Sequence, residues 1–150
     1  MKHLLLVYLR QEPDSGYRVR VRAWSRSRDG GRKLSPHFAV REFACRDGSD
    51  PVFVAERLPQ VLEQLRERFG QPVRITSGYR TPGYNRRVGG KAYSQHLYGC
   101  AADIVIPGVD PETVGRAARQ LMPDFGGVGV YPEKGFTHVD VRERRADWTA

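Results

Sequence analysis

One stretch of helical periodicity, flanked by several short β-type stretches, sets the fold class of this chain. Between Glu56 and Phe69 the apolar residues recur at the spacing of a single helix face, namely Leu58, Val61, Leu62, Leu65 and Phe69. Gly70 follows as a C-cap, and Pro59 stands early enough for its missing N–H to fall in the first turn. The pattern predicts one long helix with an apolar face that packs on the rest of the core.

The residues that follow predict short strands and one further helix. Strand patterns occupy residues 72–77, 101–106, 127–131 and 136–142, and the turn sequence PEKG joins the last two as a hairpin. Asp110 and Pro111 are the expected N-cap and first residue of a second helix that reaches about Met122. We therefore predict an α+β fold with a central antiparallel sheet and flanking helices.

The N-terminal part of the chain predicts a different kind of element. Residues 4–9 are apolar and β-prone, EPDSG is turn chemistry, and residues 17–24 alternate between apolar side chains and Arg18, Arg20 and Arg22. This pattern predicts a β-hairpin with one cationic face. Residues 25–35 are rich in Ser, Arg and Gly and predict a loop or linker. The expected division is a basic hairpin appendage and linker at 1–34 and a main domain at 35–150.

The charge distribution points to an anionic partner for that appendage. The chain of 150 residues is 39% hydrophobic, which suffices for one domain with a core, and its net charge is +8. Residues 1–34 carry nine Lys/Arg and three Asp/Glu, so most of the excess lies there. A cell-wall polymer, nucleic acid or a membrane surface would each suit such a segment. The alternative is that the arginines only protect an edge strand from pairing.

The sequence lacks the features of several other classes of protein. The two cysteines form no CxxC pair, so zinc-finger and thioredoxin-type sites are not expected. The opening MKHLLLVYLRQ has an apolar run shorter than that of a secretory signal and no cleavage site. No apolar stretch approaches the roughly 20 residues of a membrane span. We expect no signal peptide and no membrane span, and a protein that is cytoplasmic until released.

Two short segments contain candidate metal ligands. In SQHLYGCAAD, His96 and Asp103 stand seven positions apart, and in FTHVD, His138 and Asp140 alternate along a predicted strand. Catalytic zinc commonly takes three ligands from His, Asp or Glu and leaves a fourth position to water. If the strand from Ala101 pairs with the final hairpin, these side chains share one sheet face and His96 folds over them. Asp140 would then either orient the His138 imidazole or accept a proton, and spacing leaves both roles open.

Three blocks of sequence resemble a known family. SGYRTPGYN, VGGKAYSQHLYGCAADI and GGVGVYPEKGFTHVDVR occur in the order found in the zinc D-alanyl-D-alanine peptidases, which include the vancomycin-resistance dipeptidases and carboxypeptidases. The family signature SxHxxGxAxD is matched at every fixed position, by Ser94, His96, Gly99, Ala101 and Asp103. The resemblance covers residues 34–148 and is strongest to small cell-wall and phage-type members. It implies the fold shared with Hedgehog signalling domains.

The resemblance also implies roles for individual residues. It places zinc on His96, Asp103 and His138, and it gives Arg80 the task of polarising the scissile carbonyl and Ser94 that of holding substrate. Many members carry an acid three residues before the second His, where this chain has Gly135, so the base would be Asp140 or Glu133. Tyr131 is a further candidate for contact with substrate. For Tyr131 and Trp148 alike, a place in the cleft and a place in the core both stay open.

The implied function is a zinc metallopeptidase that hydrolyses peptidoglycan stem peptides or cross-links. A bond near a D-alanine is the expected target, cut by a carboxypeptidase or an endopeptidase, and a phage-type lysin is the favoured kind of protein. The alternative is a catalytically silent, zinc-containing module that binds the cell wall, which the missing acid at Gly135 permits. Nucleic acid binding through the arginine-rich segment is the least favoured of the three.

Overall fold

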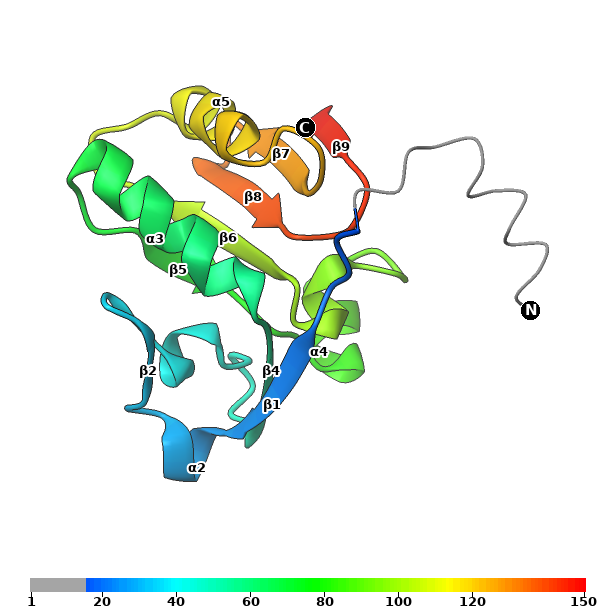
Figure 1. Cartoon of the computed structure of the whole chain (residues 1–150). Coiled ribbons are helices and arrows are strands. Elements are labelled where there is room, and N and C mark those ends of the chain that lie inside the picture. The colour runs from blue at the N-terminus through cyan, green and yellow to red at the C-terminus, as the bar shows by residue number, and fades with distance from the viewer. Residues whose placement is uncertain (1–15) are drawn as a thin grey trace.

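The computed structural model describes residues 16–150 and has a mixed α+β fold built on a five-stranded sheet (Figure 1). Across the sheet the strands run in the order β5 (Arg74–Ser77), β6 (Ala101–Val105), β8 (Phe136–Asp140), β7 (Gly127–Tyr131) and β9 (Ala146–Thr149). Neighbouring strands are antiparallel except β7 and β9, which are parallel. The predicted α+β class is confirmed.

Both predicted helices form with the expected ends, and they lie side by side over one face of the sheet (Figure 1). Helix α3 (Arg57–Phe69) ends where Gly70 adopts φ 60, the left-handed conformation that a C-cap requires. Helix α5 (Pro111–Leu121) begins after Asp110, whose carboxylate accepts a hydrogen bond from the Thr113 N–H. None of the helices in residues 16–150 has the length and apolar character needed to cross a membrane.

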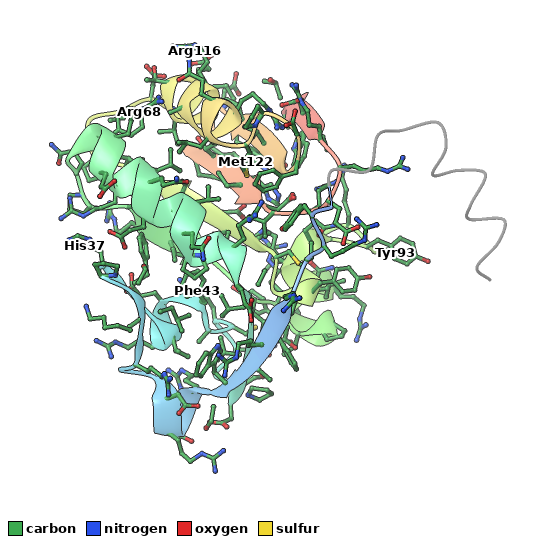
Figure 2. All side chains as sticks on the ribbon, in the orientation of Figure 1. His37, Phe43, Arg68, Tyr93, Arg116 and Met122 are labelled. Atoms are coloured by element: carbon green, nitrogen blue, oxygen red, sulfur yellow. The ribbon has the colours of Figure 1, made fainter. Side chains whose placement is uncertain are left out.

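The alternation of side chains along the strands separates a core face from a polar face. Ala102 and Ile104 of β6 and Val139 of β8 are buried in the hydrophobic core with the apolar residues of α3 and α5. The residues between them point to the opposite face of the sheet. Figure 2 shows the contrast between the fully buried Met122 and Tyr93, which is 83% exposed. The face opposite the two helices is therefore available for polar groups.

The N-terminal hairpin is not confirmed. Strand β1 (Val21–Ser25) pairs antiparallel with β4 (Pro51–Ala55), a strand that the sequence analysis did not predict, and residues 4–9 lie outside the described part of the chain. The prediction of a loop over residues 25–35 is wrong, because α2 (Arg26–Asp29) and β2 (Lys33–Ser35) form there. Strand β2 pairs with β3 (Phe38–Ala39) in a second small sheet. The division of the chain at residue 34 stays a prediction.

Candidate metal centre

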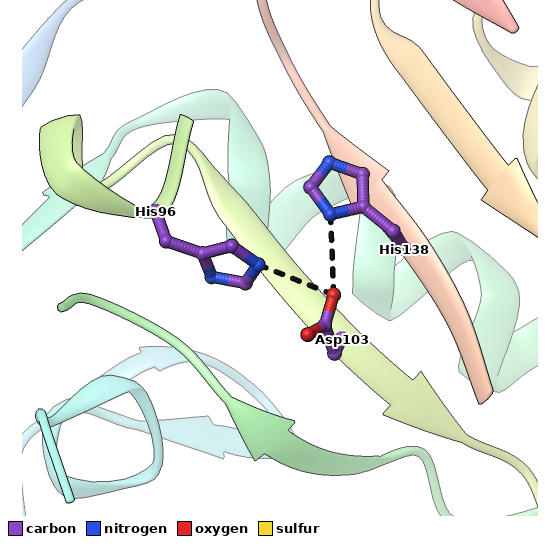
Figure 3. Close-up of side chains that lie close together, drawn as sticks. All are labelled: His96, Asp103 and His138. Carbon is purple, nitrogen blue, oxygen red and sulfur yellow. Dashed lines mark hydrogen bonds and ion pairs between the residues drawn. The ribbon is translucent and has the colours of Figure 1, made fainter. Parts of the chain in front are cut away.

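The three predicted metal ligands meet on the polar face of the sheet (Figure 3). Asp103 of β6 stands directly opposite His138 of β8 in the antiparallel register. His96 comes from the short helix η2 (Gln95–Tyr98), which precedes β6 and folds over the sheet. One ligand atom from each residue lies within 4.8 Å of the others, and all three residues are buried. The predicted juxtaposition of these side chains is thus what the fold produces.

Hydrogen bonds outside the cluster decide which nitrogen each imidazole turns inward. His96 Nδ1 lies 2.7 Å from the Gly78 carbonyl oxygen, which only accepts, so Nδ1 carries the hydrogen and Nε2 faces Asp103 Oδ1 at 3.2 Å. His138 Nε2 lies 2.7 Å from Asp140 Oδ2, so this ring turns Nδ1 toward Asp103 Oδ1 at 3.1 Å. Partners of this kind fix the tautomer and orientation of metal-binding imidazoles.

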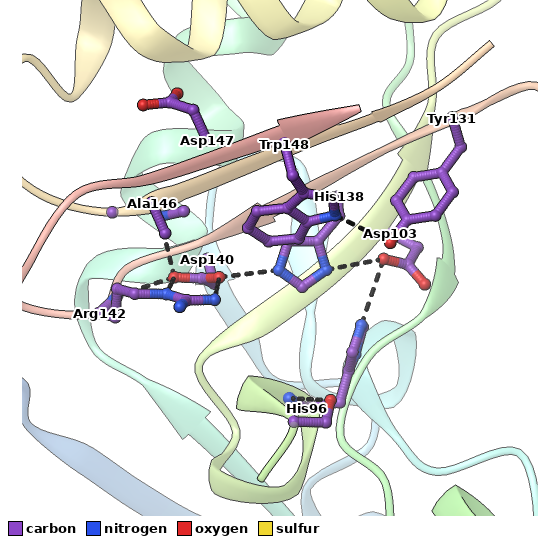
Figure 4. Close-up of polar contacts among 12 residues, drawn as sticks. His96, Asp103, Tyr131, His138, Asp140, Arg142, Ala146, Asp147 and Trp148 are labelled. Atoms are coloured by element: carbon purple, nitrogen blue, oxygen red, sulfur yellow. Dashed lines mark hydrogen bonds and ion pairs between the residues drawn. The ribbon is translucent and has the colours of Figure 1, made fainter. Parts of the chain in front are cut away.

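Asp140 lies behind His138, away from the point where the three ligands converge (Figure 4). Its carboxylate is fully buried and accepts hydrogen bonds from the Gly127 N–H at 2.9 Å and from Arg142 Nε and Nη2 at 2.8 and 2.7 Å. The His138 ring therefore separates Asp140 from Asp103. Of the two roles that spacing left open, this geometry fits the orientation of the imidazole.

The contacts of the cluster keep its carboxylates charged. Burial acts to raise the pKa of Asp103, but hydrogen bonds and charge from His138 and His96 outweigh it and hold that pKa well below its usual range. Burial likewise opposes ionisation of Asp140, and contacts with Arg142 and His138 hold its pKa low. For His138, burial lowers the pKa, yet Asp103 and Asp140 raise it above the ordinary value. Both carboxylates are therefore ionised at neutral pH.

Arg80, the residue to which the resemblance gives the scissile carbonyl, is held beside the cluster by three contacts. Its Nη2 lies 3.4 Å from Asp103 Oδ2, and its Nε donates to Ser77 Oγ at 3.0 Å. Nη1 donates to Oδ1 of Asn85 at 3.1 Å, a buried residue of the short helix α4 (Pro82–Arg87). A Cβ on Gly90 would come within 2.0 Å of that oxygen, so the glycine makes room for the contact. A guanidinium has more N–H donors than these three contacts use.

The other predicted site residues lie at different distances from the cluster. Ser94 is the N-cap of η2, and its hydroxyl accepts from the His96 N–H at 3.2 Å, so it shapes the backbone beside the ligand. Glu133 is exposed in the turn between β7 and β8, and within residues 16–150 no contact joins it to the cluster. Tyr131 of β7 is half-buried and lies on the polar face, stacked on Phe136 with ring centroids 4.4 Å apart.

Strand β9 brings Trp148 to the same face, and this strand was not predicted. The Trp148 ring lies 5.0 Å from the His138 ring, centroid to centroid. The glycines of β7 are the sequence feature that could have indicated groups packed over this strand. A Cβ on Gly129 would come 2.3 Å from the Trp148 indole, and a Cβ on Gly127 would come 2.3 Å from the Asp140 carboxylate. Glycine inside a strand often marks a close approach of neighbouring groups. The alternating glycines thus make space for the groups packed over this strand.

Sequence comparison identifies a peptidase family whose members are consistent with the mixed α+β fold and the His–Asp–His cluster. Residues 32–140 match the family model described as Peptidase M15, and the chain belongs to this family, as the resemblance predicted. The peptidoglycan L,D-endopeptidase MepK of Escherichia coli K12 is 35% identical over 99 residues, which cover 58% of this chain and 52% of MepK. MepK of Shigella flexneri matches with the same identity and coverage. The chain spans about half the length of the curated relatives it matches.

Proposed function

We propose that this chain is a zinc-dependent peptidase that hydrolyses peptide bonds of peptidoglycan. The observation that carries the proposal is the buried convergence of His96, Asp103 and His138 beside Arg80, in a chain of the Peptidase M15 family. Two imidazoles of defined tautomer and one ionised carboxylate suit zinc, which accepts nitrogen and oxygen ligands. We further propose the arrangement shared with the Hedgehog domains as the specific fold, and the cell wall as the place of action.

The residues in and around the cluster have different roles in this reaction. When bound, zinc supplies a Lewis acid and lowers the pKa of a water molecule that it holds. Asp103 and the two imidazoles hold the metal, while Gly78 and Asp140 keep the rings in position through their outer nitrogens. The N–H groups of Arg80 that are not engaged donate to the carbonyl oxygen of the scissile bond. A fixed donor of this kind stabilises the negative charge that develops there.

The positions of Asp140 and Glu133, the two candidate bases, favour one alternative to a peptidase. Asp140 is shielded by the His138 ring, and Glu133 is exposed in a turn outside the cluster. A zinc-containing module that binds peptidoglycan without cutting it is therefore the second candidate. It shares the metal and the fold with the peptidase and differs in turnover alone.

The relatives favour an endopeptidase over a carboxypeptidase. MepK is described as a peptidoglycan L,D-endopeptidase, and we propose the same class of bond for this chain. Trimming of a terminal D-alanine by a carboxypeptidase is the alternative that the resemblance leaves. Fragment masses separate these possibilities, because an endopeptidase splits cross-linked dimers and a carboxypeptidase removes a single amino acid.

The test is mass spectrometry of purified peptidoglycan fragments incubated with the zinc-loaded protein, with and without a chelator. Cleavage that the chelator abolishes and zinc restores is the expected result, and the masses identify the bond. Cleavage unaffected by the chelator would overturn the metal-dependent mechanism. Stoichiometric zinc and fragment binding without any cleavage would select the silent module.

Asp140→Asn distinguishes an orienting carboxylate from a base. Because the amide keeps the size of Asp140 but loses its charge, the His138 ring is held less firmly, and we expect zinc affinity to fall about 10- to 100-fold. Competition with a chromogenic chelator measures this affinity. Glu133→Gln is the matched control and is expected to leave zinc affinity unchanged. Wild-type zinc affinity in Asp140→Asn, combined with slower cleavage, would instead support Asp140 as the base.

We also propose that the exposed arginines before and within β1 bind an anionic wall polymer. Arg18, Arg20 and Arg22 are exposed, in line with the predicted cationic face. Replacing all three by Glu is expected to reduce sedimentation with purified cell walls at low salt. At low salt the attraction between arginines and an anionic polymer is only weakly screened, so its loss has a large effect. The control makes the same change at Arg68, Arg74 and Arg116, which are exposed elsewhere. Equal sedimentation of both variants and wild type would refute the proposal.

A further inference from the structure

Tyr131 and Trp148 form a polar contact at the edge of the metal centre. The indole Nε1 of Trp148 donates a hydrogen bond to the Tyr131 hydroxyl oxygen, 2.9 Å away. The same indole contacts His138 at 5.0 Å between ring centroids. Figure 4 shows the phenol pointing from β7 toward the side of the cluster where Asp103 lies. The pair therefore lines the cluster next to one of its ligands.

The chemistry of the two groups leaves one donor available. An indole N–H only donates, so the Tyr131 oxygen is the acceptor in this contact. A phenol also carries its own O–H, and within residues 16–150 no acceptor contacts the Tyr131 hydroxyl. That hydrogen can be donated to a carbonyl or carboxylate oxygen. Because the Trp148 N–H points at one lone pair of the Tyr131 oxygen, the Tyr131 O–H must point elsewhere, which restricts its rotation.

Several contacts hold the indole that restricts this hydroxyl. Gly129 lies beneath the Trp148 ring without a side chain, and the Arg142 guanidinium stands 5.5 Å from the ring centroid on the same polar face. Strand β9 itself is held by Arg119 of α5, which donates to the Ala146 carbonyl at 3.2 Å and to the Asp147 carboxylate at 3.0 Å. The indole thus has a defined position relative to β7 and β8.

We propose that Tyr131 is a substrate-binding residue that donates its O–H to an oxygen of the bound peptide, and that Trp148 is the positioning residue that aims it. The proposal rests on the proposed peptidase function and names a contact of the same site. Trp148 lies beyond residues 32–140, the part of the chain that matches the family model. The ligand class is a peptide whose backbone carbonyl or carboxylate oxygen reaches the Tyr131 side of the cluster.

The main test compares Tyr131→Phe, Trp148→Phe and the double variant with wild type. Loss of one neutral hydrogen bond is expected to raise KM about 5- to 10-fold in Tyr131→Phe with little change in kcat, since the contact forms in the bound substrate as well. Trp148→Phe keeps a ring over Gly129 but loses the N–H, and a rise of about 3-fold is expected. The double variant should be no worse than Tyr131→Phe, which shows that the two groups act together.

Binding is measured separately from turnover, so that failure of the proposed function is distinguishable. In a Trp24→Phe background, Trp148 is the only tryptophan, and its fluorescence reports binding of a soluble stem tetrapeptide to the zinc-loaded protein. All proteins in this comparison carry Trp24→Phe, and tighter binding with Tyr131 intact than with Tyr131→Phe supports the inference even if no bond is cut. Equal affinity of the two overturns it, and so does the absence of tetrapeptide binding by wild type. Tyr93→Phe, which changes an 83% exposed tyrosine, is the matched control and should bind like wild type.

Discussion

His96→Ala is expected to abolish stoichiometric zinc binding and to lower peptide cleavage by at least about 100-fold, the scale of the charge stabilisation that a catalytic metal supplies. The reason is geometric, because two protein ligands remain where a catalytic zinc site ordinarily has three. Elemental analysis of the purified protein gives the metal content, and fragment mass spectrometry gives the rate. Circular dichroism verifies that the variant, which empties a buried position, is folded.

The chain offers a matched control for this variant. His37, which is labelled in Figure 2, is exposed and pairs with Glu63 of α3, and it does not belong to the cluster of His96, Asp103 and His138. His37→Ala is expected to keep full zinc content and cleavage. If His96→Ala also keeps stoichiometric zinc, His96 does not belong to the ligand set, and the assignment of Asp103 and His138 would need a different third partner.

Arg80→Ala is expected to lower kcat about 100- to 1000-fold while zinc content stays at the wild-type level. This is the usual scale for removing a donor that stabilises a developing oxyanion. Arg80 contacts Asp103 Oδ2, while the oxygen of Asp103 that faces both imidazoles is Oδ1, so the metal ligands keep their arrangement. Cleavage rates at saturating and limiting substrate, together with elemental analysis, test both parts of the expectation.

Two comparisons make the Arg80 result specific. Arg87→Ala changes an exposed arginine of the neighbouring helix α4, whose guanidinium stands over Tyr84, and it should leave kcat unchanged. Arg80→Lys retains the charge without the planar fork and is expected to recover part of the rate. A rise in KM with wild-type kcat in Arg80→Ala would mean that Arg80 binds the ground state and does not act on the developing charge.

The sequence predicted that His96, Asp103 and His138 converge, because the alternation of side chains along a strand is a local rule. Side chains two apart on a strand share a face, so pairing of the strand at Ala101 with the final hairpin was enough to bring Asp103 and His138 together. The role of Asp140 could not be predicted in the same way. That role depends on which nitrogen of His138 turns inward, and only the hydrogen bond to Asp140 decides it.

The parts of the fold that were not predicted depend on pairing between distant segments. Strand β1 pairs with β4, about thirty residues later, and the alternation in residues 17–24 carries no information on its partner. The alternation in β9 covers only four residues, too few to predict a strand, and its place beside β7 depends on Arg119 and on the space above Gly129. Sequence therefore predicted the elements with local periodicity and not those fixed by contacts across the fold.

The attachment of β9 through Arg119 affects how acidity acts on this protein. Arg119 donates to the backbone carbonyl oxygens of Met122, Phe125, Gly126 and Ala146, which neither gain nor lose protons in the working range, and also to the Asp147 carboxylate, which acid neutralises. A guanidinium stays protonated throughout the same range. Acidification should therefore remove the charge of Asp147 and leave the backbone contacts of Arg119, including the one to Ala146 of β9. Two parts of the protein accordingly contribute to its pH–rate profile, namely the ionisable groups of the cluster and the Asp147 contact that helps to hold β9.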